Sequence, residues 1–376
     1  MNTTSMRLFL LNAALLLFVA SSAVAQKKAP QFVIKAKIAH FTDSLLFMNY
    51  GTLGASKLDS AVVKDGVFTF KGHVDEPTVA MIFTKTFKVK IDLYIENTNI
   101  TVAGDANERF TYSVTGAGTV KENELLNQRY LDNRRRTIAL YEKAYQLKNS
   151  GDSIAAAKIQ VQADSQYHWE YTYRHEYIAA HPKSYISAFE LLGYTTTITL
   201  RNSIKLYEGL DASIKSSNVG KEIAARIELL SKVEEGKPAQ NFTQTTPDGK
   251  EVTLTSYKGR YVLVEFWASW CGPCRAENPN LLKQYELYNK KGFDILSVSL
   301  DKDKELWLKA VEKDALPWTH VSDLKGWENE VAVLYGIRAV PASFLIDPAG
   351  KIVATGLRGE TLNKKLETLF GKTPAN

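Results

Sequence analysis

The sequence contains very little cysteine: its 376 residues include only two, Cys271 and Cys274. This scarcity excludes a disulfide-rich scaffold, in which several bridges hold a small domain together. It also excludes a cysteine-based zinc site, because one C-x-x-C pair supplies half of the ligands that a tetrahedral zinc ion takes. A bridge between two cysteines so close together would remove little entropy from the unfolded chain, so it would be a weak structural staple.

Histidine is scarce as well, with six residues in the chain. Three of them, His168, His175 and His181, fall in one stretch, but no two are spaced four residues apart. The H-E-x-x-H pattern of a zinc enzyme is also absent from the sequence. We therefore expect no metal site and no cofactor.

A large excess of charge of one sign is missing too. The formal net charge is +6, and acidic and basic residues are mixed along the chain. The densest basic run, Arg134 to Arg136, lacks the interleaved aromatic residues and the glycine-rich context of nucleic-acid-binding modules. We interpret this run as the solvated face of a helix and expect no nucleic-acid partner.

Long hydrophobic runs are confined to the beginning of the sequence. Arg7 precedes an apolar run from Leu8 to Ala20, and Ala23-Val24-Ala25 then forms an A-x-A cleavage pattern before Gln26. The run is shorter than the roughly 20 residues that cross a bilayer. We expect residues 1–25 to be the cleaved signal peptide of a periplasmic protein, with no stable membrane insertion after cleavage. A retained N-terminal anchor is the alternative.

The rest of the chain divides into three parts with different periodicity. Residues 26–117 are β-rich: apolar and polar residues alternate in Phe32–Lys37, and Asp65-Gly66 predicts the tight turn of a hairpin. Residues 118–235 show the spacing of helices, and residues 236–376 alternate between strands and helices. We expect a multidomain chain with an N-terminal β-sandwich, a helical middle region and a C-terminal α/β domain.

The two cysteines lie where a strand is followed by a helix. The nearly continuous apolar run Tyr261–Phe266 is typical of a buried central strand. Cys271 would be the N-cap of the helix, with Pro273 in the first turn, where the missing N–H of proline costs nothing. Cys274 would lie on the same helix face within bridging distance, which predicts a Cys271–Cys274 disulfide.

This placement predicts different roles for the two sulfurs. The helix dipole and the free N–H groups at the helix start would stabilise a thiolate on Cys271, whereas Cys274 would be less accessible. We therefore expect Cys271 to attack a substrate disulfide and Cys274 to resolve the resulting mixed disulfide.

Two acids and one proline fit the same mechanism. Glu265 interrupts the apolar strand, and burial would raise its pKa toward the range useful for moving the proton of Cys274. Glu277, one helical turn beyond Cys274, could do the same or simply favour the helix start. Pro341 opens a later strand and could follow a cis peptide bond, although a trans bond is the default.

Residues 258–359 resemble the thioredoxin superfamily, specifically the exported TlpA-like thiol–disulfide oxidoreductases. The resemblance rests on Val264-Glu265-Phe266-Trp267-Ala268-Ser269-Trp270-Cys271-Gly272-Pro273-Cys274 and on Tyr335-Gly336-Ile337-Arg338-Ala339-Val340-Pro341. It implies a thioredoxin fold for the C-terminal domain, a cis Pro341 beside the cysteines, and a Val340 backbone that pairs with substrate.

The same resemblance implies further site residues. Trp270, Gly272 and Pro273 would contact the substrate. Glu265 takes the place of the buried aspartate of thioredoxin, and Glu277 matches an acid of the TlpA-like proteins. The N-terminal part resembles the extension of Bacteroidetes TlpA-like proteins, through the hairpin Leu58 to Val74 and the stretch His181 to Leu192.

A thioredoxin-type C-G-P-C motif favours a strongly reducing couple. We therefore expect a reductase of protein disulfides that is recharged by a thiol electron donor in the membrane. One alternative is a peroxiredoxin-like thiol peroxidase, although the Pro/Thr-bearing loop of those enzymes is absent. The other is a partner-binding module with an accessory thioredoxin domain, in which the N-terminal domain docks a partner.

Overall fold

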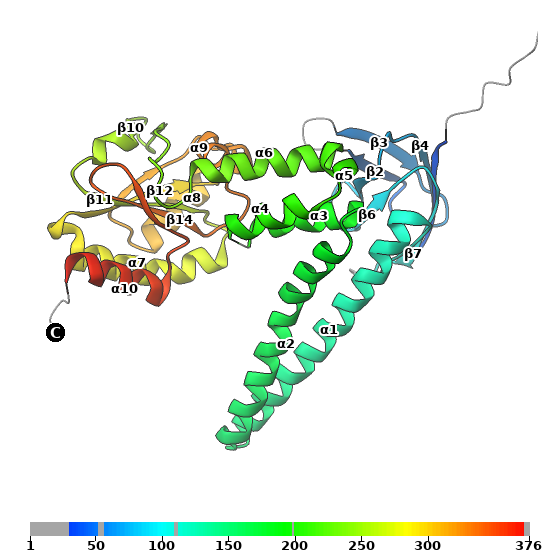
Figure 1. The fold of residues 1–376 in the computed structure, drawn as a ribbon, viewed down its shortest axis with the longest axis horizontal. Coiled ribbons are helices and arrows are strands. Elements are labelled where there is room, and N and C mark those ends of the chain that lie inside the picture. Colours follow the sequence, from blue (N-terminus) through cyan, green and yellow to red (C-terminus); the bar gives the residue numbers. More distant parts are fainter. Residues whose placement is uncertain (1–29, 52–55, 109–111, 198, 372–376) are drawn as a thin grey trace, which may run out of the picture.

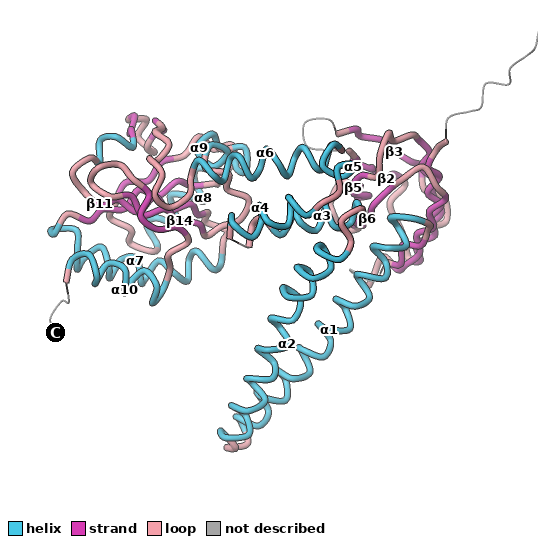
Figure 2. The backbone as a smooth tube through the Cα atoms, viewed as in Figure 1, coloured by secondary structure: helices cyan, strands magenta, loops and turns pink. Residues whose placement is uncertain are grey.

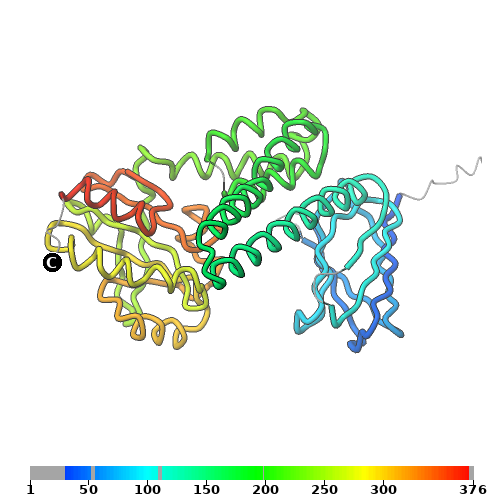
Figure 3. Tube along the Cα trace, turned by 90° about the horizontal axis from the view of Figure 1, so that it is seen from below, coloured from blue at the N-terminus to red at the C-terminus, as the bar shows by residue number. Residues whose placement is uncertain are grey.

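The computed structural model describes residues 30–51, 56–108, 112–197 and 199–371, so the expected signal peptide lies outside the described residues. The chain forms a β-rich part, a helical part and an α/β part in sequence order (Figure 1). Strands gather at the two ends of the molecule, with only helices and loops between them (Figure 2). A view turned by 90° shows the same order of the three parts (Figure 3).

The N-terminal part is a sandwich of two four-stranded sheets. One sheet has the order β4 (Val67–Gly72), β1 (Phe32–Ala39), β7 (Asn99–Asp105) and β8 (Ser113–Thr115). The other has the order β3 (Lys57–Val62), β2 (Leu45–Tyr50), β5 (Thr78–Phe83) and β6 (Lys90–Ile95). Alternate residues of both sheets share one buried core, which includes Phe32, Ile34, Met48 and Ile82. The expected β-sandwich is therefore confirmed.

The tight turn expected at Asp65-Gly66 is confirmed, with Lys64 and Val67 in an antiparallel bridge, but the strands on either side do not continue this pairing. Asp65 and Gly66 do form a tight turn with positive φ, but β3 pairs with β2 and β4 pairs with β1. The Ile38 N–H donates to the Gly66 carbonyl across 2.8 Å, and a Cβ on Gly66 would lie 2.1 Å from the Ile38 carbonyl oxygen. The turn thus packs against β1, and β4 joins the sheet that contains β1 while β3 belongs to the sheet that contains β2.

The middle of the chain is helical, as expected, and its described residues form six helices. They are α1 (Gly118–Asn149), α2 (Ser153–Ala180), α3 (Tyr185–Tyr194), α4 (Leu200–Gly209), α5 (Ala212–Ser216) and α6 (Asn218–Lys232). The long α1–α2 hairpin projects away from the rest of the molecule (Figure 1). It turns at Gly151, whose φ is +90°, and Asp152 is the N-cap of α2, with its carboxylate accepting a hydrogen bond from the Ala155 N–H.

The C-terminal part is built on a five-stranded sheet with the order β13 (Thr319–Val321), β12 (Phe293–Ser299), β11 (Tyr261–Trp267), β14 (Ala342–Ile346) and β15 (Ile352–Thr355). β11, β12 and β13 are parallel, whereas β14 and β15 are antiparallel to their neighbours. The central β11 is buried along almost its whole length, as its apolar run predicts. A short hairpin, β9 (Thr243–Thr245) and β10 (Glu251–Thr253), precedes the sheet.

The helices of this part are α7 (Gly272–Tyr288), α8 (Lys304–Lys313), α9 (Glu330–Leu334) and α10 (Gly359–Phe370), and the 3-10 turns are η1 (Leu254–Tyr257), η2 (Asn289–Lys291) and η3 (Gly326–Glu328). From β11 onward the chain alternates strand and helix as β11, α7, β12, α8, β13 and α9, and it ends with the antiparallel pair β14 and β15 followed by α10. This is the thioredoxin-like arrangement that was expected. In the described part of the chain, no helix combines the length and the hydrophobicity needed to cross a membrane.

Helix α6 connects the helical part to the α/β part. The buried Arg226 donates a hydrogen bond to the Gly336 carbonyl, and Glu222 forms an ion pair with Arg338 at 3.2 Å. The expected boundaries at residues 117/118 and 235/236 fall beside the start of α1 and just after the end of α6, and we propose them as the domain limits.

Candidate active site

Cys271 and Cys274 lie at the end of β11, where α7 begins, and they form a disulfide. Cys271 is the N-cap of α7, and its sulfur accepts a hydrogen bond from the Cys274 N–H at 3.2 Å. Cys271 is 5% exposed and Cys274 is 1% exposed. A thiolate on Cys271 would therefore lie at the positive end of the helix, beside an N–H that already points at the sulfur.

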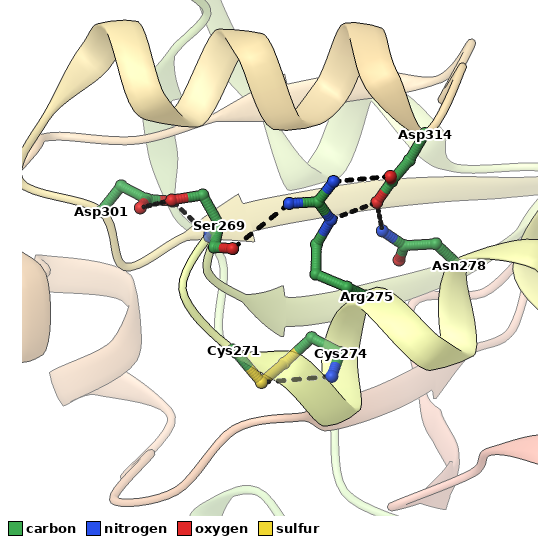
Figure 4. The surroundings of a disulfide bond; sticks show 7 residues. All are labelled: Ser269, Cys271, Cys274, Arg275, Asn278, Asp301 and Asp314. Atoms are coloured by element: carbon green, nitrogen blue, oxygen red, sulfur yellow. Dashed lines mark hydrogen bonds and ion pairs between the residues drawn. A yellow bond between two sulfur atoms is a disulfide. The ribbon is translucent and has the colours of Figure 1, made fainter.

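The loop that presents Cys271 is held on both sides (Figure 4). The buried carboxylate of Asp301 accepts hydrogen bonds from the Ser269 N–H at 2.9 Å and from its hydroxyl at 2.5 Å. From the other side, Arg275 donates to the Ser269 carbonyl at 3.3 Å. Arg275 is itself fixed by a two-bond ion pair with Asp314. These contacts fix the backbone two residues before the nucleophile.

Sequence reasoning missed Asp301, Arg275 and Asp314 as supports of this loop. Asp301 follows the last residues of β12, and Asp314 follows the end of α8. Their position after strand or helix ends is a weak signal, because it does not say which loop they reach. The role of these three residues follows from the tertiary fold, which brings together three segments that are distant in the sequence.

Glu265 lies at the centre of the sheet and is 5% exposed. Its Oε2 atom accepts a hydrogen bond from the Ser297 hydroxyl at 2.8 Å. Burial raises the pKa of Glu265 to about 8, the Ser297 hydrogen bond opposes this rise, and the charge of Glu277 adds to it. The direction of the shift is the one expected from the sequence, and a carboxyl with this pKa can exchange protons near neutral pH.

Glu277 is half-buried on α7, and its carboxylate has two partners. Its Oε1 atom accepts hydrogen bonds from the Gly359 N–H at 2.7 Å and from the Asn280 side chain at 2.8 Å. Since Gly359 is the first residue of α10, Glu277 joins the start of that helix to α7. The structure thus gives Glu277 a structural task that sequence reasoning did not foresee.

The Val340–Pro341 peptide bond is cis. Pro341 directly precedes β14, and Ala342 of that strand pairs with Phe266 near the end of β11. Cys271 follows β11 after a short loop, so the chain brings Val340, Pro341 and Cys271 to the same end of the sheet. The structure therefore places together the segments that the resemblance predicted to be neighbours.

The surface beside the disulfide is aromatic. Trp270 is 57% exposed, and Gly272 and Pro273 are also exposed. The Trp270 ring lies 6.0 Å from the ring of Trp327, which is 46% exposed. Sequence reasoning missed Trp327, and its only sequence signal is a large apolar residue in a polar, glycine-containing turn. The two rings form an apolar surface directly beside Cys271.

No metal site accompanies these residues in the described ranges, where no three His, Cys, Asp or Glu side chains gather as ligands would. The chemistry that the arrangement supports is thiol–disulfide exchange. It has one sulfur at a helix start, a second sulfur within bonding distance, and a buried acid that titrates near neutral pH.

Comparisons with known proteins agree with this chemistry. The AhpC/TSA family matches residues 236–355, and a domain of unknown function (DUF4369) matches residues 32–124. The thiol-disulfide oxidoreductase ResA of Bacillus thuringiensis is 34% identical over 141 residues, which cover 38% of this chain and 79% of that protein. ResA of Bacillus subtilis is 30% identical over 132 residues, covering 35% of this chain and 72% of that protein.

Among solved structures, the thioredoxin domain of a thiol-disulfide oxidoreductase from Bacteroides vulgatus is 41% identical, with 36% of this chain and 98% of that chain covered and a TM-score of 0.35. The curated ResA relatives are matched over most of their own length, and the residues matched by the AhpC/TSA family, 236–355, include the cysteine pair. Through its α/β domain, this chain belongs to the family of thiol–disulfide oxidoreductases.

Proposed function

We propose that this protein is an exported reductase of protein disulfides that works through Cys271 and Cys274. The observation that carries the proposal is the position of Cys271 at the start of α7, with its sulfur accepting the Cys274 N–H. Helix N-termini stabilise thiolates, and a stabilised thiolate is the attacking species in disulfide exchange. The Gly272-Pro273 pair between the cysteines favours the reducing direction, as in thioredoxin.

The reaction has two exchange steps. In the first, the Cys271 thiolate attacks one sulfur of a substrate disulfide, forms a mixed disulfide, and releases the other substrate sulfur as a thiolate. In the second, Cys274 loses its proton and attacks the Cys271 sulfur, which breaks the mixed disulfide and releases the second substrate thiolate. The substrate gains two electrons, and the protein ends with the Cys271–Cys274 disulfide.

Glu265 is the better candidate for taking the proton of Cys274. Its carboxyl is buried and has a pKa of about 8, which matches proton transfer at neutral pH. The Oε1 atom of Glu277 is instead engaged with the Gly359 N–H and with Asn280. We assign proton transfer to Glu265, and to Glu277 the support of α7 and α10 with an electrostatic effect on Glu265.

Substrates would bind over the aromatic surface formed by Trp270 and Trp327. Because Cys271 is only 5% exposed, a substrate sulfur that reaches it must come close to its neighbours Trp270, Gly272 and Pro273. The Val340 backbone, next to the cis Pro341, would pair with the chain that carries the substrate disulfide. An extended protein segment with apolar residues beside its cystine fits this surface.

Insulin reduction by the purified protein tests the proposal. Cys271→Ser should abolish reduction, whereas Cys274→Ser should form mixed disulfides that persist because the resolving sulfur is missing. Full activity in Cys271→Ser would refute the assignment of the nucleophile. A thiol-dependent peroxide assay separates the peroxidase alternative, for which we expect no turnover above background.

Export and recharging belong to the same proposal. The A-x-A pattern at Ala23 to Ala25 supports cleavage before Gln26. After each turnover the disulfide has to be reduced again, and a thiol donor in the membrane is the source that we propose for a periplasmic protein. Mass spectrometry of protein from the periplasm should find Gln26 as the first residue, and an intact Met1 would contradict cleavage.

Docking of a partner by the N-terminal part remains a prediction. The projecting α1–α2 hairpin exposes Leu131, Ile138 and Tyr145 at intervals of seven residues on α1. Regularly spaced exposed apolar side chains favour a contact with another helix. A pull-down with residues 26–235 tests this role, with Ile138→Glu as the variant that should lose the partner.

A further inference from the structure

A row of polar side chains crosses the centre of the five-stranded sheet. Ser343 of β14, Glu265 of β11, Ser297 of β12 and His320 of β13 lie side by side in register. Residues paired across neighbouring strands point to the same face of a sheet. Each of the four is at most 5% exposed. Polar groups buried in this way need hydrogen-bond partners, so the partners reveal how the row is organised.

The hydrogen bonds beside Glu265 have a defined direction. The Trp318 indole Nε1–H donates to the Ser297 hydroxyl oxygen at 2.8 Å, and this hydroxyl donates to Oε2 of Glu265, also at 2.8 Å. An indole N–H can only donate. Among the residues that the structure describes, the Ser297 hydroxyl has no further partner, so Glu265 is the acceptor available to its proton.

We propose that Ser297 and Trp318 are positioning residues that keep Oε2 of Glu265 as a hydrogen-bond acceptor and leave Oε1 as the atom that exchanges the proton of Cys274. This inference rests on the proposed function. During resolution, the Cys274 thiol loses its proton, Oε1 of Glu265 gains it, and the resulting thiolate attacks the Cys271 sulfur. A proton on Oε2 would require the Ser297 hydroxyl to donate elsewhere, and among the described residues this hydroxyl has no acceptor other than Glu265.

The other groups near Glu265 do not replace this hydrogen bond. Burial raises the pKa of Glu265, the hydrogen bond from Ser297 opposes this rise, and the charge of Glu277 on α7 adds a smaller rise. Burial lowers the pKa of His320 to about 4, which leaves that side chain neutral at pH 7. The Ser343 hydroxyl, on the opposite side of Glu265, donates to the Leu357 carbonyl at 2.9 Å.

Three single variants test the proposal through the pKa of Glu265 in the reduced full-length protein. The pKa is read by infrared spectroscopy from the carboxyl band that Glu265→Gln removes. Ser297→Ala should raise it by about 1 to 2 pH units, because a hydrogen bond to the ionised form is lost. Trp318→Phe keeps an aromatic ring at this position but removes the indole N–H that holds the Ser297 hydroxyl. The hydroxyl can then rotate, so we expect a smaller rise in the pKa of Glu265. Ser343→Ala, the matched control in the same row, should leave the pKa unchanged.

The double variant separates a directed chain of hydrogen bonds from general packing effects. If Trp318 acts through Ser297, Trp318→Phe should cause no further shift in the Ser297→Ala background. An unchanged pKa in Ser297→Ala overturns the proposal, and so does an equal shift from Trp318→Phe in both backgrounds. The titration needs no substrate, so its outcome is independent of insulin reduction, which tests the proposed function separately.

Discussion

The Arg226 guanidinium of α6 donates a hydrogen bond to the carbonyl of Gly336, across the contact between the helical and α/β parts. Arg226 is only 6% exposed, and burial together with the charge of Arg338 lowers its pKa to about 10. Gly336 lies five residues before Pro341, in the segment that leads through the cis peptide bond into β14. The helical part is thus joined directly to the segment that we expect to bind substrate.

A methyl group on Gly336 should loosen this contact. The φ of Gly336 is +66°, and a Cβ there would lie 2.6 Å from the Arg226 side chain and 3.1 Å from Leu229. We expect Gly336→Ala to lower the free energy of unfolding by about 2 to 4 kcal/mol, from backbone strain plus the clash. Urea unfolding of the full chain measures the loss.

Gly350→Ala is the matched control, because Gly350 also has a positive φ of +89° but nothing lies within 4 Å of its Cβ position. Gly350→Ala should lower the free energy of unfolding by about 1 kcal/mol, the cost of placing a side chain on a left-handed backbone conformation. Equal losses in the two variants would mean that the contact with Arg226 adds no constraint.

Glu265 should make the stability of the protein depend on pH. Its folded-state pKa of about 8 lies above the ordinary value of 4.5, so the folded state binds more protons between these pH values. The free energy of unfolding must therefore fall as pH rises through this window. Glu265→Gln cannot titrate, so wild type should lose roughly 3 to 5 kcal/mol relative to it between pH 4.5 and pH 8.

Urea unfolding of the oxidised proteins at several pH values in this window measures the difference. The oxidised state is used because both cysteines are then in the disulfide and do not titrate. Parallel stability profiles for the wild type and Glu265→Gln would show that Glu265 has an ordinary pKa in the folded protein.

Much of this site could be predicted from local patterns in the sequence. The apolar run before Cys271 and the proline in the first turn predicted a buried strand and a helix with Cys271 as its N-cap, because both are local patterns. The charged residue in the middle of that run predicted a buried acid with a raised pKa.

The rest depends on how distant strands align. Ser297, His320 and Ser343 join Glu265 only through strand register, which no local pattern specifies. The turn at Asp65-Gly66 was visible in the sequence and is present, but its docking on β1 was not, so the sequence did not show that the flanking strands join different sheets. Trp327 and Arg226 likewise gain their roles from segments far away in the chain.

Replacing Trp327 should weaken the reduction of protein disulfides and leave the reduction of small disulfides unchanged. Its ring lies 6.0 Å from that of Trp270 and is 46% exposed, so a protein substrate at Cys271 would cover both rings. We expect Trp327→Ala to raise KM for a protein disulfide about tenfold, as for loss of an aromatic contact worth about 1.4 kcal/mol. Turnover of a small disulfide such as hydroxyethyl disulfide should stay unchanged.

Leu306→Ala provides the comparison, because Leu306 is another apolar residue of this domain and is 56% exposed. It should leave KM for both substrates unchanged. Loss of activity on the small disulfide in Trp327→Ala would point to a damaged cysteine pair rather than to a substrate contact.

The reduction potential of the Cys271–Cys274 couple tests the proposed reductase most directly. Full-length protein is equilibrated in thiol–disulfide buffers of defined potential, and the reduced fraction is quantified after alkylation. We predict a value below about −200 mV, near the roughly −270 mV of thioredoxin. A value near that of the oxidant DsbA, about −120 mV, would contradict the account.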